Sequence, residues 1–168
     1  MVVIGKLFDS KYFRGSSGEY MRPAVCFFIK KLAQSGLFKS TLVAHDEKFL
    51  AECELFIRVC IEYNKEAVQL AACQTLPYYC DIRFAGRSNP SGGELIQSYL
   101  HCMKATSKEY VRSGYCLALG NVPSYLFKDG QNFARICRAL IQGSQTVSGP
   151  ISENSNTNLK VTLIITYC

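Results

Sequence analysis

Nine cysteines stand out among the residues of this 168-residue chain that could do chemistry. Cys53 and Cys60 are seven positions apart, as are Cys73 and Cys80, and no Cys-x-x-Cys pair occurs. Because zinc sites of the usual kind need two close ligand pairs, we expect no metal site and no cofactor. No signal peptide is recognisable, so we expect free thiols in a reducing compartment, most of them packed as small apolar side chains.

An enzyme that depends on cysteine or on a phosphate loop is the weakest interpretation. His101 and Cys102 are adjacent, and successive side chains on a helix point about 100° apart, so they cannot form a nucleophile–base pair by themselves. The glycine-rich stretch 86–93 has neither a preceding strand nor the Gly-Lys-Ser/Thr ending of a phosphate loop. We therefore expect a protein that is not an enzyme.

Binding of an anionic partner by basic side chains is a stronger interpretation than enzyme activity. The formal net charge is +6, and basic residues gather toward both ends around an acidic middle. This distribution suits an acidic protein partner. The basic stretches lack the interleaved aromatic residues of a single-strand RNA-binding surface, so we expect no nucleic-acid partner. No run of 18 apolar residues is present, so we expect no membrane span. The predicted partner-binding residues are Arg58, His101, Lys104, Arg135 and Arg138.

The elements that would carry these residues are helices. Apolar residues recur at helical spacing in six segments, 20–35, 47–63, 65–80, 94–104, 108–120 and 131–143. The first is expected to bury Val25, Phe28, Ile29 and Leu32. The second should bury Phe49, Leu50, Cys53, Phe56, Ile57, Cys60 and Ile61. The fourth should bury Leu95, Ile96, Tyr99, Leu100 and Met103. The last should bury Phe133, Ile136, Cys137, Leu140 and Ile141.

A repeated octapeptide organises these segments. Glu19–Cys26, Glu66–Cys73 and Glu109–Cys116 each place a Glu seven residues before a Cys, with a period of 43 to 47 residues. A period of this size predicts stacked two-helix units, in which the octapeptide begins the first helix of each pair. We predict an all-α solenoid of HEAT/armadillo-like repeats with about three antiparallel pairs. The predicted divisions are 1–14 as the end of a preceding repeat, 15–147 as the repeats, and 148–168 as a polar loop and strand-like tail.

The five predicted partner-binding residues belong to the second helices of these pairs, which usually line the concave binding surface of such solenoids. Solvent-exposed charge without any partner is the competing interpretation for each of them taken singly.

Two blocks of sequence go further than a generic repeat pattern. They are Met21, Arg22, Ala24, Val25 and Cys26, and then Leu117, Ala118, Leu119, Gly120 and Pro123. Together they resemble the C-terminal region of the tubulin-folding cofactor D family, which are tubulin-specific chaperones. The resemblance covers roughly residues 5–146 and does not include the tail.

The resemblance implies a cytoplasmic, cytoskeleton-associated scaffold that captures β-tubulin and helps to assemble or take apart the αβ-tubulin heterodimer. It implies tubulin-folding cofactors C and E and a small Arf-like GTPase as further partners, in a complex that stimulates GTP hydrolysis by tubulin. It implies no catalytic residue in this chain. A HEAT-repeat scaffold that binds proteins without tubulin specificity is the alternative.

Overall fold

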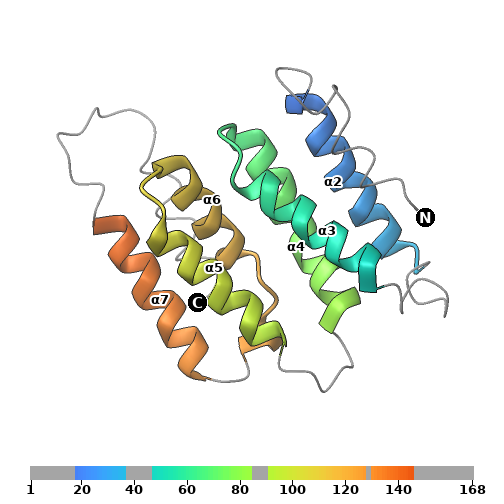
Figure 1. Ribbon diagram of the computed structural model, residues 1–168. Helices are drawn as coiled ribbons and strands as arrows, with labels where there is room; N and C mark the ends of the chain where they lie inside the picture. The colour runs from blue at the N-terminus through green and yellow to red at the C-terminus, as the bar shows by residue number, and fades with distance from the viewer. Residues whose placement is uncertain (1–17, 37–46, 85–90, 128–129, 146–168) are drawn as a thin grey trace.

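The computed structural model describes residues 18–36, 47–84, 91–127 and 130–145. Within these ranges the chain forms α-helices and one 3-10 turn, and no strand (Figure 1). The elements are α2 (Gly18–Gln34), α3 (Glu47–Ile61), α4 (Glu66–Phe84), α5 (Ser91–Ala105), α6 (Glu109–Gly120), η4 (Ser124–Phe127) and α7 (Gly130–Gln145). The predicted all-α class is confirmed. The predicted end of a preceding repeat, 1–14, and the tail, 148–168, lie outside the described residues.

The octapeptides occupy the expected places. Glu19 is the second residue of α2, and Glu66 and Glu109 open α4 and α6. Acidic residues suit these positions because the first turn of a helix carries partial positive charge. Pro77 lies inside α4, which continues past it to Phe84.

The helices that pack most closely are not the pairs predicted from the sequence. The expected pairs α2/α3, α4/α5 and α6/α7 make small contacts, whereas α2 packs most extensively on α4, and α3 on α4 and α5 on α6 also pack closely. The connections explain the last two of these pairings. Only 62–65 separate α3 from α4 and 106–108 separate α5 from α6, and such short links hold consecutive helices as antiparallel neighbours.

Contacts between these hairpins build the rest of the fold. Helix α4 also packs on α2 and α6, while α7 contacts α5 and α6. Figure 1 shows the helices side by side, with α5 lying over α6 and α3 lying over α4. This packing is compatible with stacked helical repeats.

The core confirms the predicted stripes of the central helices. All seven expected residues of α3 are buried, and so are all five expected residues of α5. In α2 and α7, the first and last of the described helices, part of the predicted buried stripe is exposed. Phe28 in α2 is 52% exposed, and Phe133 and Ile141 in α7 are 46% and 57% exposed, so these three predictions were wrong. Among the described residues α2 and α7 are outermost and pack on one side only, which leaves part of each apolar stripe uncovered.

The fourth octapeptide position joins neighbouring units. Gln69 is 4% exposed, and its amide nitrogen donates to the carbonyl oxygens of Ile61 (3.0 Å), Tyr63 (2.7 Å) and Tyr110 (2.7 Å). Arg22, at the same position of the first octapeptide, places its guanidinium carbon 4.1 Å from the centre of the Tyr63 ring. In both octapeptides this side chain faces the segment that follows α3.

Candidate functional site

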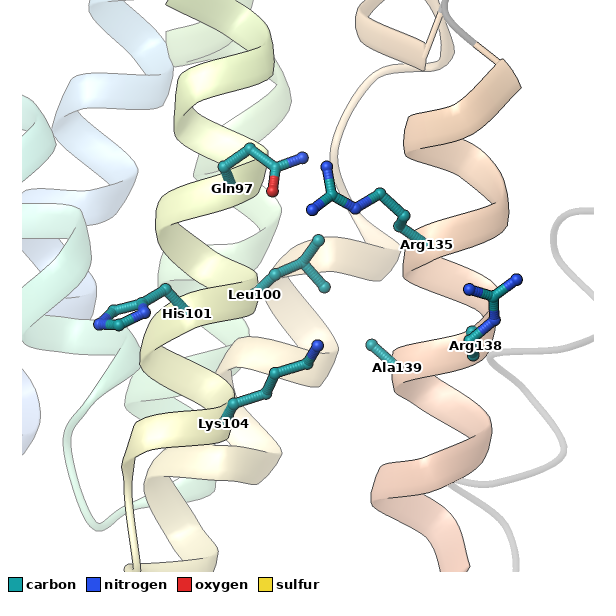
Figure 2. Close-up of a pocket in the computed structure, with 7 residues that line it drawn as sticks. All are labelled: Gln97, Leu100, His101, Lys104, Arg135, Arg138 and Ala139. Atoms are coloured by element: carbon teal, nitrogen blue, oxygen red, sulfur yellow. The ribbon is translucent and has the colours of Figure 1, made fainter.

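A groove of about 270 Å³ lies between α5 and α7. Its lining comes from one face of each helix and combines basic, amide and small apolar side chains (Figure 2). The lining residues are Gln97, Leu100, His101 and Lys104 of α5, and Arg135, Arg138 and Ala139 of α7. We call this feature the α5/α7 groove.

Helical spacing puts these residues on facing surfaces. In α5, Gln97, Leu100 and Lys104 recur at intervals of three and four, which places them along one face. The same helix buries Ile96, Tyr99 and Met103 on its other side, and α5 packs there on α6. Packing of α5 on α6 therefore fixes the face that α5 turns toward α7.

The floor of the groove is apolar and its rim is cationic. Leu100 and Ala139 are 5% and 3% exposed, so their side chains fill the space between the helices. Lys104, Arg135 and Arg138 are exposed at the rim. Figure 2 shows Arg135 beside Gln97 at one end of the groove, and Lys104 reaching toward Ala139 at the other.

No carboxylate compensates these cations within the described part of the chain. None lines the groove, and none lies within ion-pair distance of Lys104, Arg135 or Arg138. The ion pairs found among the described residues lie elsewhere, between Lys65 and Glu19 (3.5 Å) and between Arg83 and Glu47. The groove is therefore a local concentration of positive charge, suited to attract an anionic group.

Four of the five predicted partner-binding residues line this groove. His101, Lys104, Arg135 and Arg138 are brought together by α5 and α7, although Figure 2 shows the His101 ring pointing away from α7. Arg58 is placed differently. It is half-buried, and its guanidinium donates to the Ser98 hydroxyl at 2.6 Å, which ties α3 to α5.

Gln97 was not identified from the sequence as a candidate residue. It precedes Lys104 by seven residues, which is two helical turns, so the helical spacing of α5 contains the signal that could have found it.

Most of the described thiols are buried in the core. All eight described cysteines are free, and Cys26, Cys53, Cys60, Cys73 and Cys80 are buried. Burial raises the pKa of Cys53 and of Cys73 to about 12 and that of Cys116 to about 11. These thiols are therefore protonated at neutral pH, and a protonated thiol is a poor nucleophile. No group of three or more His, Cys, Asp or Glu side chains among the described residues is placed to hold a metal ion.

Buried tyrosines bridge helices by bonds to carboxylates. The Tyr79 hydroxyl of α4 donates to Glu54 Oε2 of α3 at 2.8 Å, and the Tyr115 hydroxyl of α6 donates to Glu62, just after α3. Burial, together with the neighbouring carboxylate, raises the pKa of Tyr79 and of Tyr115 well above the ordinary value of 10.0. These groups hold helices together and lie outside the α5/α7 groove.

No protein-family model matches the chain, and no solved structure matches it. Each described helix is too short or too polar to cross a membrane.

Proposed function

We propose that this chain is a segment of a tubulin-specific chaperone and acts as a binding scaffold rather than as an enzyme. Its helices would form a solenoid of HEAT-like repeats that presents a basic surface to β-tubulin. The observation that carries the proposal is the α5/α7 groove, where three cations share a rim without a carboxylate from the described residues. The family resemblance of the blocks around Met21 and Leu117 supports the choice of tubulin among acidic proteins.

The chemistry of the groove fits capture of an acidic protein. Exposed ion pairs contribute only about 0–1 kcal/mol each, so no single contact at this rim would hold a partner. Several cations at one place act together on the encounter, because a cluster of like charge steers an oppositely charged partner and raises its association rate. The groove would therefore orient β-tubulin, while other surfaces of the complex supply most of the affinity.

The remaining partners follow from the same proposal. Tubulin-folding cofactors C and E and a small Arf-like GTPase would join the complex, which would assemble or take apart the αβ-tubulin heterodimer and stimulate GTP hydrolysis by tubulin. The chain itself would contribute no catalytic group. Its site of action would be the cytoplasm, in association with the cytoskeleton.

Capture of β-tubulin by the full chain tests the proposal. The critical variant is Arg135→Glu with Arg138→Glu. Its matched control is Lys48→Glu with Lys108→Glu, which changes the net charge equally at the exposed starts of α3 and α6, at residues that do not line the groove. Glutamate is tolerated at those starts because it complements the helix dipole.

We expect the Arg135/Arg138 variant to slow association with β-tubulin by about tenfold at low salt, and the control variant to change it little. The difference should shrink toward 1 M salt, where the Debye length is about 3 Å. Circular dichroism of each variant checks that the helices are intact. Failure of the wild-type chain to bind β-tubulin would overturn the proposal.

The alternative is a helical-repeat scaffold that binds acidic proteins without tubulin specificity. It is favoured by the groove itself, because exposed cations select charge rather than a particular protein. An unrelated acidic protein of similar net charge separates the two functions. Equal binding of that protein and of β-tubulin would establish the alternative.

A further inference from the structure

We infer that the α5/α7 groove takes an extended acidic segment of a partner protein, a run of Asp and Glu residues, rather than a folded surface. The inference rests on the proposed function, since it specifies what a binding scaffold would recognise at this site. The juxtaposition that carries it is the spacing of Arg135, Arg138 and Lys104 along a closed apolar floor.

The cations are spread along the groove and do not converge on one point. Figure 2 shows the Arg135 guanidinium beside Gln97 and the Lys104 ammonium near Ala139, whereas the Arg138 guanidinium lies on the side of α7 turned away from α5. A single phosphate or carboxylate could not contact all three at once. Separate anions carried on one chain could, and a run of acidic residues supplies them.

The length of the groove suits an extended peptide. Gln97 and Lys104 are seven residues apart, which corresponds to about 10 Å along a helix. An extended chain rises about 3.3 Å per residue, so about three or four residues would span this distance. Arginine guanidinium groups can take carboxylates through two parallel hydrogen bonds, which suits Arg135 and Arg138 to this role.

Other ligand classes fit less well. A volume of about 270 Å³ falls below the range of about 300–1,000 Å³ that is typical of small-molecule pockets, and the rim is exposed. Leu100 and Ala139 are almost fully buried already, so little apolar area is left for a partner to cover. The lining has no Phe, Tyr or Trp ring on which a nucleotide base could stack, and the His101 ring points away from α7.

Fluorescence anisotropy of the full chain with labelled peptides tests the inference. The probes are peptides of about eight Glu residues or about eight Gln residues, and an oligouridylate of about eight nucleotides. Each is titrated at about 50 mM and about 500 mM salt. We expect binding of the Glu peptide that weakens steeply with salt, and no measurable binding of the Gln peptide.

Charge reversal makes the test specific to the groove. Arg135→Glu with Arg138→Glu should lower the affinity for the Glu peptide by about tenfold or more at low salt. The Lys48→Glu, Lys108→Glu control should lower it by no more than about threefold. The reversed groove should also gain affinity for a peptide of about eight Lys residues. A misfolded variant would show no such gain, so this arm separates loss of charge from loss of structure.

The inference is overturned if the control variant loses as much affinity as the groove variant, or if oligouridylate binds more tightly than the Glu peptide. Its failure is distinguishable from failure of the proposed function. Capture of β-tubulin without binding of the Glu peptide would remove the inference alone. Binding of the Glu peptide without capture of β-tubulin would remove the tubulin proposal alone.

Discussion

Gly114 of α6 lies so close to the end of α3 that a β-carbon on it would come within 2.0 Å of the Ile61 carbonyl oxygen. The same β-carbon would lie 2.9 Å from Nε2 of Gln69, which donates to that carbonyl at 3.0 Å. Three helices therefore meet at one point, where α6 approaches α3 without a side chain and α4 supplies the hydrogen bond.

Replacement of Gly114 by alanine should destabilise the chain. Alanine is better than glycine inside a helix by about 1 kcal/mol, but the new methyl group would strike a backbone oxygen that cannot rotate away. Overpacking of this kind typically costs about 1–3 kcal/mol, so we expect a net loss of up to about 2 kcal/mol. Urea unfolding measures it, and Ser113→Ala on the same helix is the control. Equal midpoints for the two variants would show that α6 can move away from α3.

Replacement of Gln69 by glutamate should destabilise the chain at neutral pH while keeping the shape of the side chain. The carboxylate removes the donor from three carbonyl oxygens and places negative charge beside them. Leaving buried groups without a partner costs about 1–3 kcal/mol, and a buried charge costs more. Gln74→Glu is the control because Gln74 is exposed on the same helix. A loss no greater than that of the control in urea unfolding would contradict this role for Gln69.

The helices and the inward stripes of α3 and α5 were predictable because each is set by the spacing of apolar residues within one segment. The helices against which each helix packs were not predictable. The repeat period of the octapeptides shows where a two-helix unit begins, but it does not show which neighbouring helix packs against it. Short connections favoured α3/α4 and α5/α6, whereas the extensive packing of α2 on α4 joins helices that are not consecutive. The basic residues of the groove could be named from the sequence, but their convergence with Gln97 depends on how α5 and α7 are turned toward each other.

Native alkylation should modify the thiols in an order set by burial. Cys102 and Cys137 are half-buried, whereas Cys53 and Cys73 are buried and have a pKa raised to about 12. We expect iodoacetamide at about pH 8 to modify Cys102 and Cys137 at least about tenfold faster, because the thiolate is the reacting form and must be reached by the reagent. Mass spectrometry of tryptic peptides measures each site. In urea all sites should react alike, and equal native rates for Cys53 and Cys102 would contradict the buried core.

Alkaline pH should destabilise the chain through its buried hydroxyl and thiol groups. The pKa of Tyr79 and of Tyr115 is raised by burial and by a nearby carboxylate. Above the ordinary tyrosine value of 10.0, the unfolded chain releases protons that the folded chain retains, so stability falls as pH rises. Each such group contributes a slope of about 1.4 kcal/mol per pH unit, and the raised cysteine pKa values add to it from about pH 9.

Urea midpoints at about pH 7, 9 and 10.5 test this dependence. Tyr79→Phe should reduce the alkaline loss, while Tyr20→Phe should not, because Tyr20 is 80% exposed. An alkaline slope that is the same in the Tyr79→Phe variant as in the wild type would contradict a raised pKa at this hydroxyl.

Arg58 should affect stability more than binding, in contrast to Arg135. Its guanidinium donates to the Ser98 hydroxyl between α3 and α5, whereas Arg135 is exposed at the groove. Hydrogen bonds to charged groups contribute about 1.5–3 kcal/mol when buried and less when exposed, so we expect Arg58→Ala to cost about 1 kcal/mol in urea unfolding. Ser98→Ala should lower the free energy of unfolding by a similar amount. The double variant should lose little more than either single variant, since both substitutions remove the same hydrogen bond.

Binding of the Glu peptide should stay within about twofold for Arg58→Ala and fall by several-fold for Arg135→Ala. The contradicting outcome is that Arg58→Ala lowers the affinity for the Glu peptide as much as Arg135→Ala does. The acidic ligand would then extend from the groove across α5 to α3, and Arg58 would belong to the binding surface, as predicted from the sequence.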